Sequence, residues 1–174
     1  MLIAHLPAGY LLTKAFSLKF SAGEGRKLWL TGLIASVLPD IDLVFYYLEG
    51  GIRIHRQYFT HWPLFWLALL AASIILSARF RKRESITYLI VFFSGIMLHL
   101  VLDTVAGPVY WLAPFDWTPT RWVRVPRTES WWLMNLVRHR IFKAELVICG
   151  AALAVYLMSA WRVRRLEGAG KPRG

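Results

Sequence analysis

Five long apolar runs constrain the fold of this chain more than any other feature of its sequence. They cover roughly Leu2–Phe20, Leu28–Leu48, Trp62–Ala78, Ile86–Val105 and Ala144–Trp161. Each run is near the ~20 residues that an α-helix needs to cross about 30 Å of hydrocarbon, the first and third being marginal. With 57% hydrophobic residues in 174 positions, the chain is far more apolar than a soluble domain. We predict an all-α, polytopic membrane helical bundle of about five helices, in a single integral membrane domain over residues 1–174.

The remaining composition excludes several other classes. A net charge of +11 also occurs in nucleic-acid-binding proteins, but here the basic residues lie mostly between or after the apolar runs, where they orient a membrane protein. We therefore expect no nucleic-acid partner. Cys149 is the single cysteine, which excludes an intrachain disulfide and a CxxC metal site. The start, MLIAHLPAGYLL, lacks a basic region and an A-x-A-like cleavage site, so we expect it to remain as the first helix.

The Lys and Arg residues predict the orientation of the helices. The turn 79–84 holds four basic residues and the segment 162–174 holds five, which makes that segment a basic cytoplasmic tail and places both on the inner side. Five helices then put the N-terminus outside. The region 14–27 adds four basic residues inside, giving thirteen inside against eight outside. Six of those eight lie in Gly107–Lys143, a stretch rich in Trp and Arg that is too polar to span and that we predict to be an amphipathic interfacial segment.

Almost every residue able to bind a metal lies near the predicted outer end of an apolar run. Seven of the nine histidines and aspartates of the chain form this set: His5, Asp40, Asp42, His55, His61, His99 and Asp103. At ~1.5 Å per residue, Asp40 lies about 12 Å from the outer end of its run, and Pro39 beside it is expected to bend or break that helix. Ionisable groups at such depth are costly and therefore indicate function. The inner half offers only Ser and Thr, so the set predicts a pocket open to one side.

Each residue also has a simpler explanation when taken alone. His5 could be an interfacial histidine bonded to a carbonyl, Asp40 and Asp42 could cap a broken helix, and His55 could be a solvated loop residue. His99 and Asp103, four apart on one helix face, could be a structural pair. His139 lies within a basic run, VRHR, and Glu145 suits the charge of a helix terminus. Their joint placement favours a metal site, because imidazole and carboxylate ligands suit Zn²⁺, or Mn²⁺ and Fe²⁺ less well, and seven candidates can serve two ions.

Four motifs in order resemble the YdjM family of bacterial inner-membrane proteins, described as membrane-bound metal-dependent hydrolases. They are AH-x3-G at His5 and Gly9, LPD-x-D at Asp40 and Asp42, HR…TH from His55 to His61, and H-x3-D-x3-G…L-x-PF from His99 to Phe115. The resemblance spans about residues 1–115 and implies a multi-pass protein of the bacterial cytoplasmic (inner) membrane. HR…TH departs from the family pattern, in which it is usually one residue shorter and followed by Ser. Here Gln57, Tyr58 and Phe59 intervene and Trp62 follows, which bears on the role of His55 more than on that of His61.

The order of the ligands is also similar, more loosely, to that of the secreted zinc-dependent phospholipase C and P1-nuclease fold, an all-helical phosphodiesterase scaffold. That resemblance implies five metal ligands, and two further candidates that come later in the sequence. The implied ligands are His5, Asp40, His61, His99 and Asp103, with His139 and Glu145 as possible late members.

Two function classes follow from these patterns. The first is a membrane-embedded hydrolase that cleaves a phosphoester of a lipid through metal-activated water, with its active site toward the outer face. In it Asp42 is a general base or an orienting residue, and Arg56, with Arg138 or Arg140, neutralises phosphate charge. The second class is a non-enzymatic membrane protein with a structural metal site, or a metal-ion carrier. A carrier needs polar groups along its whole path, and the inner half lacks them. The sequence does not indicate an oligomeric state.

Overall fold

The computed structural model describes residues 1, 3–19, 25–51, 55–79, 85–126, 128 and 130–169, and within these ranges the chain is all-α without a strand. The prediction of an all-helical membrane protein is confirmed. The α-helices are α1 (His5–Lys19), α2 (Gly25–Ala35), α3 (Asp42–Leu48), α4 (Pro63–Arg79), α5 (Ser85–Ala106), α6 (Trp132–Arg138) and α7 (Arg140–Ala169). Three short 3-10 turns lie between α2 and α4: η1 (Leu38–Ile41), η2 (His55–Gln57) and η3 (Phe59–His61).

All five apolar runs fold as helices, but they differ in how completely they can cross a membrane. Two of them, in α5 and α7, are long and apolar enough to do so, and the bent pair made by α2 with η1 and α3 is a third candidate. α1 has 15 residues, fewer than its predicted run, and α4 has 17, as many as its run; both are shorter than the ~20 residues of a full span. Residues 2 and 20, at the limits of the first predicted run, lie outside the described residues.

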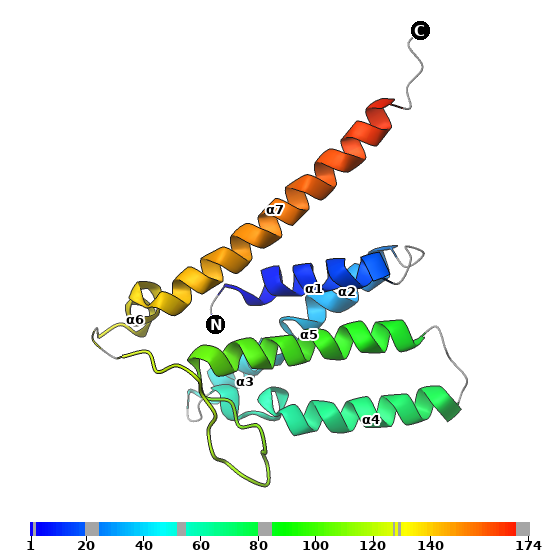
Figure 1. Ribbon diagram of the computed structural model, residues 1–174. Helices are drawn as coiled ribbons and strands as arrows, with labels where there is room; N and C mark the ends of the chain where they lie inside the picture. The colour runs from blue at the N-terminus through cyan, green and yellow to red at the C-terminus, as the bar shows by residue number, and fades with distance from the viewer. Residues whose placement is uncertain are drawn as a thin grey trace.

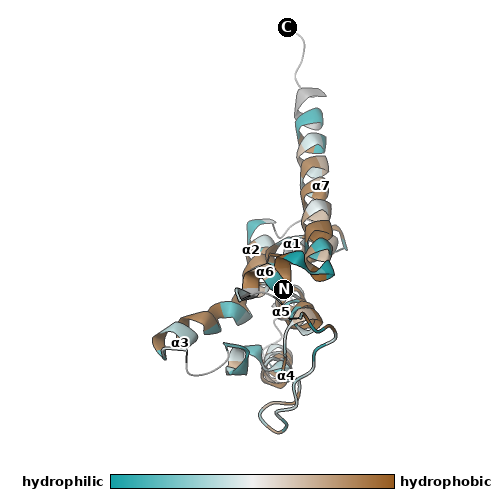
Figure 2. Ribbon diagram, turned by 90° about the vertical axis from the view of Figure 1, so that its left-hand side faces the viewer, coloured by the Kyte–Doolittle hydropathy of each residue, from teal (hydrophilic) through white to brown (hydrophobic). Residues whose placement is uncertain are grey.

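The second run is broken where its proline predicts. α2 ends at Ala35, Pro39 lies in the first turn of η1, and the two parts of the run are bent by 59°. Proline fits a first turn because its missing N–H has no helical partner there. Beyond the bend α3 leads away from the bundle (Figure 2). The break matters for the site because it brings the polar LPDID sequence to the middle of the protein.

Small residues allow α1, α2 and α5 to approach each other closely. A Cβ atom on Gly9 of α1 would collide with the Ser36 side chain, and one on Gly32 of α2 would collide with Thr13. Gly95 of α5 packs in the same way, since a Cβ there would lie 2.9 Å from Ala35 Cβ. Close contacts of this kind are a main source of helix association in lipid, where apolar burial alone supplies little.

The helices pack around α5, and α4 runs alongside it (Figure 1). The buried apolar core consists of Ala35, Trp66, Phe93, Ile96 and Leu100. α7 leaves the bundle as a long arm with a largely hydrophobic surface (Figure 2); only 17% of its apolar window is buried. An exposed apolar helix of 30 residues, about 45 Å long, is what a lipid-facing helix requires. It begins at Arg140, four residues before the predicted start, and residues 162–169 of the predicted tail continue it as helix.

The stretch after α5 folds back over the end of that helix. The backbone amides of Trp122 and Val123 donate to carbonyls of Thr104 and Val105, at 2.9 and 3.0 Å. Its aromatic side chains are prominent at the surface, with Phe115 87% and Trp122 63% exposed. Tryptophan at this position suits the headgroup layer of a membrane. The stretch is mostly irregular as far as α6, and its last residues already belong to α7.

Candidate metal centre

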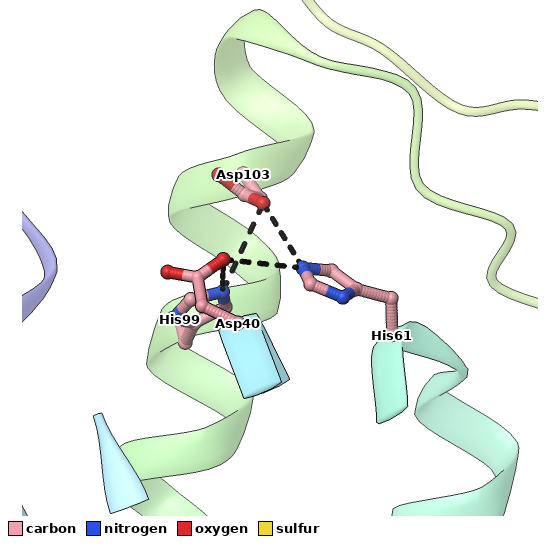
Figure 3. Close-up of side chains that lie close together, drawn as sticks. All are labelled: Asp40, His61, His99 and Asp103. Carbon is pink, nitrogen blue, oxygen red and sulfur yellow. Dashed lines mark ion pairs between the residues drawn. The ribbon is translucent and has the colours of Figure 1, made fainter. Parts of the chain in front are cut away.

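Four side chains from three separate parts of the chain converge beside α5. His99 and Asp103 project from successive turns of α5, His61 comes from η3, and Asp40 comes from η1 (Figure 3). One ligand atom from each of the four lies within 4.8 Å of the others. His61, His99 and Asp103 have side chains exposed by 1% or less, whereas Asp40 is 33% exposed. The four therefore form a buried group with one accessible member.

The distances within this group match the size of a metal ion. His61 Nε2 lies 3.3 Å from Asp103 Oδ2 and 3.8 Å from Asp40 Oδ1. His99 Nε2 lies 3.5 Å from Asp40 Oδ1 and 3.8 Å from Asp103 Oδ2. A tetrahedral ion with bonds of about 2.0–2.1 Å separates its ligand atoms by roughly 3.3 Å. The observed spacing is close to that value and slightly wider, so these residues fit a zinc-type ion.

Both histidines present the correct nitrogen to the centre. His99 Nδ1 lies 2.9 Å from the Ser36 carbonyl oxygen, which requires Nδ1–H to donate and leaves the Nε2 lone pair for a metal. His61 Nδ1 lies 2.7 Å from Asp42 Oδ2 in an ion-pair contact, while its Nε2 lies toward Asp40 and Asp103. The Nε2 atoms of both residues are buried without a hydrogen-bond partner among the described residues. Metal-binding histidines are commonly oriented by such a second contact, often a carboxylate.

A second group overlaps the first. It consists of Asp40, Asp42, His55 and His61, again with ligand atoms within 4.8 Å of one another. His55 Nδ1 lies 3.6 Å from Asp42 Oδ1, and the His55 side chain is 28% exposed. The two groups share Asp40 and His61, and a neutral imidazole offers only one nitrogen lone pair. His61 can therefore bind an ion in only one of the two groups at a time. Taken together, the two overlapping His/Asp groups are able to hold a metal ion or ions.

Asp103 is held by a bidentate arginine. Arg56 Nε donates to Asp103 Oδ2 at 2.7 Å and Nη2 donates to Oδ1 at 2.9 Å. A Cβ atom on Gly107 would collide with the Arg56 guanidinium, so a glycine at this position leaves the space that the guanidinium occupies when it binds Asp103. The Met1 amino group also contacts Asp103 Oδ1, at 2.5 Å. Arg56 was predicted as a phosphate-binding residue, and in the structure its side chain is 16% exposed beside the cluster.

His5 lies next to the four-residue group, outside it. Its Nε2 contacts Asp103 Oδ1 at 3.2 Å, and its ring stacks on that of His99 with 3.9 Å between ring centroids. Its Nδ1 is buried without a hydrogen-bond partner among the described residues. His5 therefore belongs to the same polar cluster, through the oxygen of Asp103 that faces away from His61.

The four predicted residues from the C-terminal part of the chain lie outside the metal-binding groups. Glu145 is fully buried and accepts hydrogen bonds from the backbone amides of Ile3 and Ala4, at 2.6 and 3.2 Å. It therefore caps the start of α1, while its own helix is α7. His139 ends α6, and its Nδ1 accepts from the amide of Ile141 at 3.3 Å. Arg138 and Arg140 are exposed at the junction of α6 and α7. The two metal-binding groups include none of His139, Glu145, Arg138 and Arg140.

Two contributors to the site were not singled out for these roles from the sequence. Ser36 acts through its backbone carbonyl, which every residue possesses, so no sequence signal could have found it. Gly107 belongs to the H-x3-D-x3-G pattern, and its proximity to Arg56 is the physical reason for a glycine there. Pattern spacing can identify such a glycine, but only the folded chain shows which side chain needs the space.

Fold and site together define an all-α membrane protein with a buried His/Asp cluster able to bind metal. The model of the YdjM inner membrane protein family matches residues 1–163. The chain therefore belongs to the YdjM family of inner membrane proteins. No curated protein and no solved structure matches it significantly.

Proposed function

We propose that this protein is a membrane-embedded metal-dependent hydrolase that cleaves a phosphoester of a lipid. The observation that carries the proposal is the unequal exposure of the cluster: three members are buried, while Asp40 is 33% exposed and the neighbouring Arg56 is partly exposed. A structural metal site is closed by protein on all sides, whereas a catalytic site keeps a position for water or substrate. The accessible side of this cluster provides such a position.

The surroundings of the opening favour a lipid substrate. The turns and helix that carry Asp40, Asp42 and His61 also expose apolar side chains: Ile41, Val44, Phe45 and Phe59 are between 37% and 54% exposed. In a membrane these side chains contact acyl or prenyl chains. A substrate that places its phosphate at the cluster would thus keep its hydrocarbon in lipid, which accounts for a site within the apolar part of the protein rather than in a separate domain.

Each residue of the cluster has a role in this proposal. Asp40, His61, His99 and Asp103 would hold one zinc-type ion, and we favour one ion over the two expected from the sequence because His61, which both groups share, offers a single lone pair. Such an ion supplies Lewis acidity, which activates water and polarises a phosphoryl oxygen. Asp42 orients His61 and is fully buried, which favours the orienting role over that of general base.

The remaining steps fall to the accessible groups. Asp40 faces the two histidines with Oδ1, and in this proposal its other oxygen takes the proton of the attacking water. Water adds to phosphorus and the P–O bond to the leaving alcohol breaks, consuming one water for each phosphoester. Arg56 keeps N–H groups beyond the two that bind Asp103, and these neutralise phosphate charge. By the distribution of Lys and Arg, we propose that the site faces the outer side of the inner membrane.

The test is release of phosphate or headgroup from anionic phospholipids and polyprenyl phosphates by purified protein, with and without chelator. We expect chelator to abolish activity and metal to restore it. Arg56→Gln should lower turnover or raise KM while metal stays bound, whereas Arg124→Gln, an exposed arginine outside the site, should behave as wild type. Activity that survives complete metal removal, or retained metal with no hydrolysis of any lipid in the panel, would favour a structural metal site.

A further inference from the structure

A mostly apolar groove with a lysine in its lining lies at the other end of the bundle. A groove of about 330 Å³ between α1, α2 and α7 is lined by Tyr10, Lys14, Trp29, Tyr156, Ser159, Ala160 and Val163. α7 diverges from α1 in this direction (Figures 1 and 2). Lys14 is nine residues from His5, about 14 Å along α1, so the groove is separate from the metal centre.

The lining of the groove is mostly apolar, and the polar groups of its lining residues are hydrogen-bond donors that the protein does not use. Lys14 has no ion pair, and the polar atoms of Tyr10, Trp29, Tyr156 and Ser159 have no hydrogen-bond partner among the residues that the structure describes. Neither α1 nor α2 contains an Asp or Glu. Five donors around one opening, including a cation, form a site complementary to an anion.

The aromatic rings give the groove a defined shape. Tyr10 stacks on Trp29 with 5.1 Å between centroids and meets Tyr156 edge-on at 6.3 Å. Packed rings of this kind hold the hydroxyl and indole groups in place at little cost in conformational freedom. The partly buried Lys14 lies in the same lining, so its charge acts at a fixed position.

The position of the groove points to the headgroup layer of a membrane. Lys14 is five residues from Lys19 at the end of α1, about 7.5 Å, and Ser159 is six residues from Arg165 at the end of the candidate span in α7, about 9 Å. Val163, at the rim, is 54% exposed and is available to hydrocarbon. Basic pockets between helices at this depth are characteristic of anionic lipid recognition.

We propose that this groove binds the phosphate of an anionic phospholipid in the leaflet opposite to the metal centre. Lys14 pairs with the phosphate, and the hydroxyls of Tyr10, Tyr156 and Ser159 donate to its oxygens. The volume suits a headgroup phosphate, and the acyl chains extend along the exposed apolar surface of α7. This site is independent of the hydrolase proposal, because it uses no residue of the metal cluster.

The experiment is native mass spectrometry of the purified full chain, titrated in detergent with phosphatidylglycerol or phosphatidylcholine. Wild type should bind one phosphatidylglycerol more tightly than phosphatidylcholine. Lys14→Gln should weaken that binding about fivefold, the effect of one lysine near a membrane surface. Lys27→Gln removes the same charge from an exposed position on α2 and should bind as wild type does.

Several results would overturn the proposal. These are equal binding of the two lipids, equal effects of Lys14→Gln and Lys27→Gln, or displacement of phosphatidylglycerol by inorganic phosphate, which would identify a free anion as the ligand. If Lys14→Gln fails to fold, the double variant Tyr10→Phe with Tyr156→Phe retains both rings. It should still lose the preference for phosphatidylglycerol, and an unchanged preference would refute the site.

Discussion

The contact between Asp42 and His61 provides the sharpest test of the metal centre. Asp42→Asn replaces a carboxylate that lies 2.7 Å from His61 Nδ1, with both side chains fully buried. The neutral amide removes the negative charge beside Nδ1, so it stabilises the imidazole less in the orientation that offers Nε2 to the metal. Loss of such a supporting contact typically costs 10- to 100-fold in metal affinity, which is about 1.4–2.8 kcal/mol. Competition with a chromophoric zinc chelator measures this change directly.

Two control variants bracket the zinc affinity expected for Asp42→Asn. Asp116→Asn makes the same chemical change at an exposed carboxyl, whose pKa is lowered by hydrogen bonds from Thr118, and should leave affinity unchanged. His99→Ala removes a proposed ligand and should abolish tight binding. If Asp42→Asn binds zinc as tightly as Asp116→Asn does, the contact has no role in orienting His61. If Asp42→Asn loses all metal while His99→Ala retains it, Asp42 is itself a ligand and the group containing His55 is the occupied one.

Three further predictions concern the ligands, the packing and the orientation. Asp40→Ala and His99→Ala should each strip metal in elemental analysis from a wild-type value of about one ion per chain; full retention in both variants would refute the site. Gly32→Ala should lower the free energy of unfolding by about 1–3 kcal/mol through its clash with α1. Gly150→Ala, whose added methyl meets nothing within 4 Å, is the control, and equal melting temperatures would contradict the packing argument. In a Cys149→Ser background, single cysteines in the stretch before α6 should be labelled from outside and those in the turn after α4 only from the cytoplasm; the opposite result would invert the topology.

The buried carboxylate of Glu145 caps a different helix from the one that its position in the sequence suggests. From the sequence, Glu145 suited the terminus of its own helix, because acidic residues stabilise that end. In the structure the same physics applies to a different helix, since Glu145 accepts from the backbone amides of Ile3 and Ala4. The unsatisfied amides at a helix start attract any carboxylate within reach, and only the packing of α7 against α1 determines which carboxylate that is.

The sequence by itself determined the helical membrane class, the break near Pro39 and the set of residues from which the cluster is built. These features follow from local chemistry: apolar run length, the missing amide of proline and the cost of ionisable groups in lipid. Spacing within one helix also placed His99 and Asp103 on the same face. Each of these arguments needs only residues that are close in the chain.

Only the tertiary structure decided how the members of that set relate to one another. It places Asp42 behind His61, makes Arg56 a bidentate partner of Asp103, and sets His5 beside the four-residue group. These relations join residues up to about a hundred positions apart, and they depend on how closely α1, α2 and α5 approach through Gly9, Gly32 and Gly95. Ligand geometry requires placement to within tenths of an ångström, and hydropathy and spacing do not carry information on that scale.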